Sequence, residues 1–162
     1  MGTTIRTTLV ALVSAALLVA GGTPASVAGN EEFRTGKRCT ENSDAVKRCA
    51  AIRQFSPSSP PRHRKYQAEA YVEEYGEQQV RMRLILFQRK TDDGWSTVAR
   101  RKWRLGWDDS YQIAWTDTRR CRATAKDTFR TRARVQWRHP DFPTTISRAW
   151  INSTPLRKRQ FC

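Results

Sequence analysis

The chain has 162 residues, with 30 Lys and Arg against 15 Asp and Glu, a formal net charge of +15 and an isoelectric point near 10.7. This length suits one domain with one core, and we expect a monomer. Beyond residue 28 no apolar stretch reaches the roughly 20 residues of a membrane-spanning helix, so we expect no integral membrane segment there. The charge favours a polyanion or an acidic protein as partner, although it also serves solubility.

The first 28 residues have the pattern of a secretory signal peptide. Arg6 gives a positive start, and an apolar run follows over residues 9–20. Pro24 then breaks any helix, and residues 26–28 (Ser-Val-Ala) offer the small-x-small pattern that signal peptidase recognises. The apolar run is too short to span a bilayer. We therefore predict a secreted, extracellular protein, either released or associated with the cell wall. Removal of residues 1–28 takes away one charged residue, Arg6, so the mature protein carries a net charge of +14.

Four cysteines lie in the predicted mature part: Cys39, Cys49, Cys121 and Cys162. In an exported protein an even number of cysteines predicts disulfides. A zinc site needs closely spaced pairs of ligands, which this chain lacks. Four cysteines allow three pairings, and we favour Cys39–Cys49 with Cys121–Cys162 because each bridge then stays within one compositional block.

We predict that residues 29–63 form an N-terminal segment that precedes the main domain. Apolar residues recur at helical spacing within 43–55, and Asn42 or Ser43 can cap a helix there. We therefore predict a short helix over 43–55. Proline cannot continue a helix or donate to a sheet, so the three prolines within 57–61 predict an extended arm.

From residue 64 to 162 the apolar residues alternate with a period of two, which is typical of half-buried strands. Residues 66–72 and 80–87 predict a hairpin with a turn at 74–77. In that hairpin Arg81 and Arg83 would pair with Glu69 and Glu73 across the strands. Residues 92–94 (Asp-Asp-Gly) predict a turn into a strand that starts at Trp95, and further strands are predicted at 97–105, 110–116, 120–126, 129–138 and 145–151. Short strands separated by regular turns favour an all-β sandwich or barrel.

Residues 126–135, with the sequence KDTFRTRARV, resemble the sixth strand of fibronectin type III and immunoglobulin-like sandwiches. In both, an aromatic residue opens a strand of alternating polar and small apolar residues. The resemblance implies an immunoglobulin-like antiparallel β-sandwich, here preceded by the short helix. Phe129 stands where those folds often carry a tyrosine with a hydrogen-bonded hydroxyl. The layout of signal peptide, basic β-domain and terminal cysteine is similar to small secreted proteins of actinobacteria.

The predicted strand over 129–138 carries arginines on one side. Arg130, Arg132, Arg134 and Arg138 share one parity, so their guanidinium groups line one face. Their geometry suits phosphate or carboxylate, and the strand contains no acid to neutralise them. The neighbouring Arg101 and Lys102 would add to the same anion-binding surface. The alternative is a solvated outer face without a ligand.

Six tryptophans accompany this charge. Exposed aromatic rings beside basic residues can stack on nucleic-acid bases, and Trp103 and Trp107 are the candidates for such contacts. Trp115, Trp137 and Trp150 lie on apolar strand parities, so we predict them in the core.

The main functional hypothesis is a non-enzymatic module that binds an anionic extracellular partner: nucleic acid, wall polymer or acidic protein. One alternative is a small secreted nuclease or toxin, but the chain has only His63 and His139 to act as acid and base. Another is an inhibitor of a second protein, presenting the proline-rich arm. We predict no catalytic residue, metal site or cofactor, because the relevant motifs are missing from the sequence.

Overall fold

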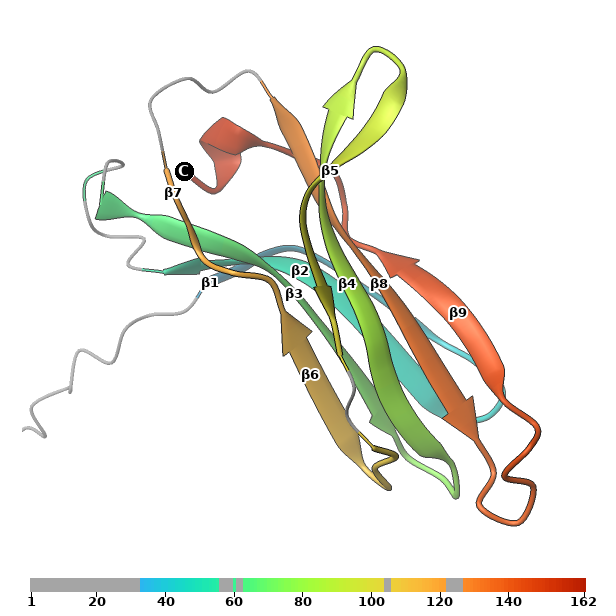
Figure 1. Cartoon of the computed structure of the whole chain (residues 1–162). Coiled ribbons are helices and arrows are strands. Elements are labelled where there is room, and N and C mark those ends of the chain that lie inside the picture. Colours follow the sequence, from blue (N-terminus) through green and yellow to red (C-terminus); the bar gives the residue numbers. More distant parts are fainter. Residues whose placement is uncertain (1–32, 56–59, 61–62, 104–105, 122–126) are drawn as a thin grey trace, which may run out of the picture.

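The computed structural model describes residues 33–55, 60, 63–103, 106–121 and 127–162. Within them the chain forms an antiparallel β-sandwich of two sheets (Figure 1). The predicted signal peptide, and most of the predicted proline-rich arm, lie outside the described residues. In the part that is described, no helix is long and apolar enough to cross a membrane.

The first sheet has the strand order β1–β2–β3–β6, with β7 also paired to β3. Its strands are β1 (Phe33–Glu41), β2 (Val46–Phe55), β3 (Lys65–Glu74), β6 (Tyr111–Trp115) and β7 (Arg119–Arg120). The second sheet has the order β10–β8–β4–β5, with β9 also paired to β8. Its strands are β4 (Gln79–Thr91), β5 (Gly94–Lys102), β8 (Thr128–Arg138), β9 (Ser147–Asn152) and β10 (Leu156–Arg157), followed by the 3-10 helix η2 (Lys158–Gln160).

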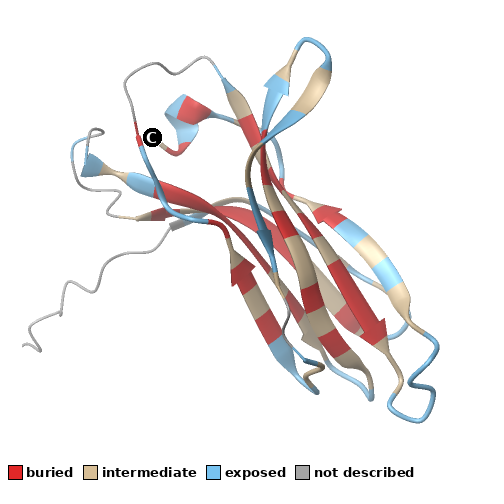
Figure 2. Cartoon of the chain, in the orientation of Figure 1, coloured by how far each residue is buried: buried red, intermediate tan, exposed pale blue. Residues whose placement is uncertain are grey.

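The core lies between the two sheets and follows the alternation predicted from the sequence. On β8 the buried residues alternate with half-buried ones, and the bands are visible along β4 and β8 in Figure 2. Phe129 opens β8 and stacks on Phe87 of β4, with ring centres 5.1 Å apart. Tyr66 and Phe161 close the same cluster. Phe129 is thus held by aromatic packing and needs no hydroxyl partner.

The predicted helix over 43–55 is wrong, because residues 46–55 form strand β2. β2 is paired with β1 and β3 along its two edges, and four successive residues, 49–52, are buried, so both of its faces are covered there. Apolar and polar residues therefore do not alternate along this part of β2, and the spacing of its apolar residues resembles that of a helix. Asn42, predicted as a helix cap, instead accepts a hydrogen bond from the backbone N–H of Val46 at 2.9 Å and closes the β1–β2 turn. The sandwich therefore includes strands from the predicted N-terminal segment.

The predicted hairpin of 66–72 with 80–87 is also wrong. Both segments are strands, but β3 belongs to the first sheet and β4 to the second. The chain crosses between the sheets at residues 75–78. Because a strand with one buried face alternates in the same way in either arrangement, the pattern could not distinguish them. Arg81 and Glu69 consequently lie in different sheets, and the expected ion pairs between them do not form.

Both favoured disulfides are confirmed. Cys39–Cys49 joins directly paired residues of β1 and β2, and Cys121–Cys162 joins the residue after β7 to the residue two positions beyond η2. The remaining predicted strands occur as β5, β6, β8 and β9. The predicted strand over 120–126 is represented by β7, and residues 122–126 lie outside the described part.

Candidate anion-binding face

The outer surface of the second sheet concentrates positive charge. Each of its five strands contains Lys or Arg, and none of these strands, all of them within the described residues, contains Asp or Glu. Since the inward parity of β8 fills the core, its arginines face outward. We call this surface the arginine–tryptophan face. It comprises Arg81, Arg130, Arg132, Arg134 and Arg138, the glutamines Gln79, Gln88 and Gln136, and Trp95, Trp107 and Trp150.

Three arginines of the arginine–tryptophan face are fixed by glutamines on the neighbouring strand. The Nε–H of Arg81 donates to Oε1 of Gln136 at 2.8 Å. Arg130 donates in the same way to Gln88 at 3.0 Å, and Arg138 to Gln79 at 3.0 Å. In each case the two residues are register partners of the β4–β8 ladder. The pairing uses Nε and leaves terminal N–H groups of each guanidinium available, apart from Nη1 of Arg138, which donates to Pro143 O at 3.3 Å.

The same three arginines, and also Arg132, lie over tryptophan rings. The Cζ atoms of Arg81 and Arg138 are 4.0 and 4.3 Å from the ring centre of Trp107. Arg130 lies 4.1 Å from the ring centre of Trp95, and Arg132 lies 4.3 Å from that of Trp150. Such cation–π contacts contribute about 0.5–2 kcal/mol each, more where water is excluded. Together with the glutamine bonds, they restrain the side chains of Arg81, Arg130 and Arg138, whereas Arg132 has the ring contact alone.

Arg132 shows what happens where the glutamine is missing. Its partner in the β8–β9 register is Asn152, which is one methylene shorter than glutamine. The Nε of Arg132 and the Oδ1 of Asn152 are both buried, and neither has a hydrogen-bond partner among the described residues. A buried polar atom without a partner costs about 1–3 kcal/mol.

Replacing Asn152 with glutamine is therefore expected to stabilise the protein. The longer amide would reach Arg132 and form the fourth bond of the series, adding about 1 kcal/mol to the free energy of unfolding. Urea unfolding of the oxidised protein measures this difference. An unchanged or lower stability in N152Q would show that the shorter side chain is not what leaves Arg132 without a partner.

Mutual repulsion acts within the arginine–tryptophan face. Burial lowers the pKa of Arg81, and the charges of Arg83 and Arg138 lower it further. Burial also lowers the pKa of Arg130, with a further contribution from Arg132. Guanidinium remains charged at any ordinary pH, so these shifts report mainly the cost of burying a charge, with a smaller cost of holding like charges together. A bound anion would relieve that cost.

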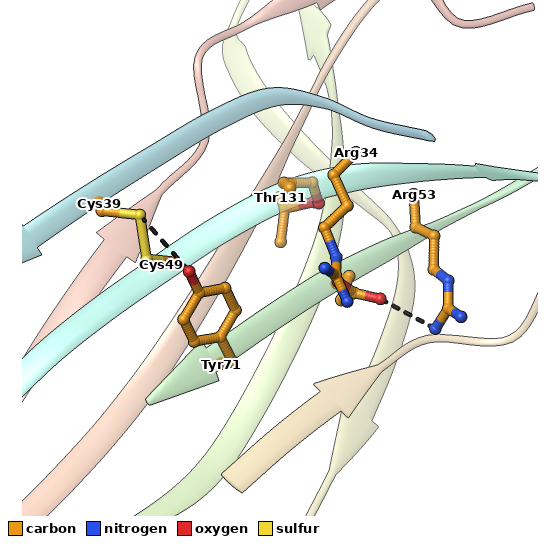
Figure 3. Close-up of polar contacts among 8 residues, drawn as sticks. Arg34, Cys39, Cys49, Arg53, Tyr71 and Thr131 are labelled. Carbon is orange, nitrogen blue, oxygen red and sulfur yellow. Dashed lines mark hydrogen bonds and ion pairs between the residues drawn. A yellow bond between two sulfur atoms is a disulfide. The ribbon is translucent and has the colours of Figure 1, made fainter. Parts of the chain in front are cut away.

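The first sheet is different, because it contains acids that pair with some of its cations. Glu69 is 1% exposed and binds two arginines: Arg34, and Arg53 at 3.0 Å. Figure 3 shows Arg34 and Arg53 converging beside the Cys39–Cys49 bridge and Tyr71. The hydrogen bond to Glu69 raises the pKa of Arg34, the opposite of the effect on Arg81.

Trp107 is placed by the loop between β5 and β6. The neighbouring residue, Asp108, exchanges two backbone hydrogen bonds with Val80 of β4, at 2.8 and 3.0 Å. Its carboxylate accepts hydrogen bonds from the backbone N–H groups of Ser110 and Tyr111, at 3.0 and 3.2 Å. Asp108 thereby fixes the loop against β4, and Trp107 reaches Arg81 and Arg138.

The D108A variant is expected to destabilise this loop in a pH-dependent way. The backbone N–H groups of Tyr111 and Ser110 lower the pKa of Asp108, so its contribution is present above the ordinary carboxyl pKa of about 4 and is lost as pH falls through the lowered value. At pH 7 the variant should lose about 1 kcal/mol. Thermal unfolding of both proteins between about pH 7 and pH 2 should show the difference shrinking below about pH 4. A difference independent of pH would contradict this role of the carboxylate.

The predicted site residues fall into two groups. Arg130, Arg132, Arg134 and Arg138 lie together on the arginine–tryptophan face, and Lys102, opposite Leu84, lies on the same side of the sheet. Arg101 pairs with the buried Ile85 and so has the opposite parity. Its guanidinium lies 4.6 Å from the ring centre of Trp103.

The tryptophans are distributed differently from the prediction. Trp137 is in the core, as predicted. Trp150 is 39% exposed on the outer surface, and Trp115 is half-buried and packs edge-on against Trp103 at 5.3 Å. Trp107 lies on the arginine–tryptophan face, whereas Trp103 does not. Trp95 was missed, although its position directly after the Asp92-Asp93-Gly94 turn on an edge strand could have indicated it.

The two histidines lie at opposite ends of the sandwich. His63 comes just before β3. Tyr66, near the start of β3, packs on Phe87, which stacks on Phe129 at the start of β8, so His63 lies at that end of the sandwich. His139 follows the other end of β8. A strand of this length separates them by roughly 30 Å. His139 instead lies 3.3 Å from the exposed carboxylate of Glu77. They cannot act together as acid and base in one site.

No protein-family model matches the sequence, and no curated protein matches it significantly.

Proposed function

We propose that this is a secreted, non-enzymatic module that binds an extended anionic partner outside the cell on its arginine–tryptophan face. A nucleic acid, an anionic wall polymer or the acidic surface of a protein has suitable chemistry. The predicted signal peptide and the two disulfides support export. The pairing of β8 with both β4 and β9 supports the immunoglobulin-like arrangement implied by residues 126–135.

One observation carries the proposal. Arg81, Arg130 and Arg138 are each fixed by a glutamine through Nε and by a tryptophan ring, in a sheet whose strands contain no acid. A face that only kept the protein soluble would gain nothing from holding its arginines still. Fixing a long side chain before binding avoids about 0.5–1.5 kcal/mol of ordering cost for each one.

The neutral part of the face also suits a polymer. Leu84 and Leu86 lie on the outward side of β4, opposite Arg134 and Arg132, and are half-buried. The exposed ring of Trp150 lies on β9, on the other side of β8, where it is the register partner of Arg134. A polyanion could place its charged groups on the arginines and rest its rings on these apolar surfaces.

A salt series tests this proposal. The mature, oxidised protein is titrated with a heparin oligosaccharide and with a single-stranded RNA at several NaCl concentrations. The logarithm of the binding constant should fall linearly with the logarithm of salt, with a slope of about −3 to −4 if four or five arginines contact anionic groups. Absence of binding at about 50 mM salt, or a flat dependence on salt, would overturn it.

The same RNA separates binding from cleavage. The proposed module leaves the RNA intact after prolonged incubation, in both the wild type and an H139A variant. Cleavage that disappears in H139A would instead support the nuclease alternative. Binding that survives high salt with a protein partner would support the inhibitor alternative.

A further inference from the structure

A pocket of about 470 Å³ opens at the end of the sandwich where residues of β7 and η2 meet. These two segments lie near the C label in Figure 1. Residues from both sheets and from η2 line the pocket. It is separate from the arginine–tryptophan face, because its β8 contribution is Phe129, on the inward parity. A volume of this size is typical of sites for small molecules.

The pocket has a cationic rim. Arg89, Arg119, Arg120 and Lys158 line it, and Lys158 is only 8% exposed. Arg119 donates a hydrogen bond to the backbone oxygen of Val98 and so links β7 to β5 across the opening. Asp127 supplies a carboxylate 3.9 Å from Arg89. Among the described residues Arg119 and Arg120 form no ion pair, so the rim keeps an excess of positive charge that a dianion neutralises better than a monoanion.

The pocket also has an apolar wall. Phe129 and Val98 line it, together with Tyr66, which is 5% exposed. Burial raises the pKa of the Tyr66 phenol, so its hydroxyl remains a neutral hydrogen-bond donor at physiological pH. Arginine forks match phosphate oxygens, while aromatic and aliphatic walls accept an apolar group.

We infer that this pocket binds a small organic phosphate monoester with an aromatic or aliphatic group, at a site independent of the arginine–tryptophan face. The phosphate lies between Arg119, which shares the inward parity of its register partner Tyr66, and Lys158, and the apolar group rests on Phe129 and Val98. The disulfide Cys121–Cys162 keeps the two cationic segments together, since it joins the residue after Arg120 to the end of the segment that carries Lys158.

Phenyl phosphate is the probe. Titration of the mature, oxidised protein, followed by two-dimensional NMR, should give saturable binding of one molecule with a dissociation constant on the order of 0.1–1 mM. The shifted signals should be those of Tyr66, Val98 and Phe129. Phenylacetate, a monoanion, and inorganic phosphate, which lacks the ring, should each bind about tenfold more weakly. Equal affinity for either would overturn the assignment to a phosphate monoester, as would the absence of saturable binding.

Variants separate this site from overall charge. R119Q/R120Q should weaken phenyl phosphate binding at least tenfold, whereas R38Q/R159Q removes the same charge at exposed positions outside the pocket and should have no effect. The variant R132Q/R134Q should also bind phenyl phosphate normally. If R132Q/R134Q abolishes phenyl phosphate binding, the ligand lies on the arginine–tryptophan face and the pocket assignment fails. If heparin binding fails while phenyl phosphate still binds, the polymer proposal fails and the pocket assignment stands.

Discussion

Replacing Arg132 and Arg134 with glutamine is expected to weaken heparin binding about 100-fold at about 50 mM salt. Both side chains lie at the centre of the arginine–tryptophan face, between β4 and β9. Each loses a charge-assisted contact, and one such contact corresponds to about tenfold in affinity. The slope of log affinity against log salt should become shallower by about 1.4 to 1.8, because two contacts with anionic groups are lost. Fluorescence titration or calorimetry across a salt series measures both quantities.

R38Q/R159Q is the matched control for this prediction, because it removes two positive charges from exposed positions elsewhere. It should reduce affinity by no more than a fewfold through the long-range field, which salt screens. Equal losses in the two variants would mean that net charge alone governs binding. Thermal unfolding of both variants must show that the fold is retained.

Removing the Cys121–Cys162 disulfide is expected to have the largest effect on stability. The bridge closes a loop with a sequence separation of 41, for which chain entropy predicts a loss of about 4 kcal/mol. Cys121 is buried beside Phe161, so alanine is the suitable replacement at this position. Urea unfolding of C121A/C162A against the oxidised wild type measures the change in the free energy of unfolding.

C39A/C49A provides the comparison. Its loop has a sequence separation of 10, and Cys39 is exposed, so the expected loss is about 3 kcal/mol. A larger loss in C39A/C49A than in C121A/C162A would show that loop closure does not dominate. It would then point to the contacts of the first bridge, including the approach of Cys39 Sγ to the Tyr71 hydroxyl at 3.9 Å.

The parity of residues within single strands could be predicted from the sequence. The alternation of β8 placed its arginines on one outward face and Phe129, Val135 and Trp137 in the core. The disulfide pairing followed from the grouping of the cysteines. Both properties depend on residues that are close in sequence, where period and spacing carry the information.

The contacts that build the arginine–tryptophan face could not be predicted in this way. The pairing of Arg130 with Gln88, and of Arg81 with Gln136, depends on the register between β4 and β8, which lie about 40 to 55 residues apart. The sequence suggested glutamates on β3 as partners of Arg81, because it could not show that β3 and β4 belong to different sheets. Trp150 is exposed for a related reason: β9 lies at the sheet edge, where its outward residue meets solvent.

The helix error has a different origin. Residues 49–52 are buried on both sides because β2 is a central strand whose outer surface is covered by the Cys39–Cys49 bridge and by the arginines that bind Glu69. Burial of both faces removes the alternation that identifies a strand. Only the neighbours of β2, supplied by distant parts of the chain, explain its pattern.

The indole N–H signals of the six tryptophans test the central claim most directly. In a heparin titration followed by NMR, the signals of Trp95, Trp107 and Trp150 should shift together and saturate. Each of these rings is in cation–π contact with at least one arginine of the arginine–tryptophan face. The signals of Trp137, in the core, and Trp115, which packs on Trp103, should stay in place. Shifts confined to Trp103 and Trp115, or no shift at saturating heparin, would contradict binding on the arginine–tryptophan face.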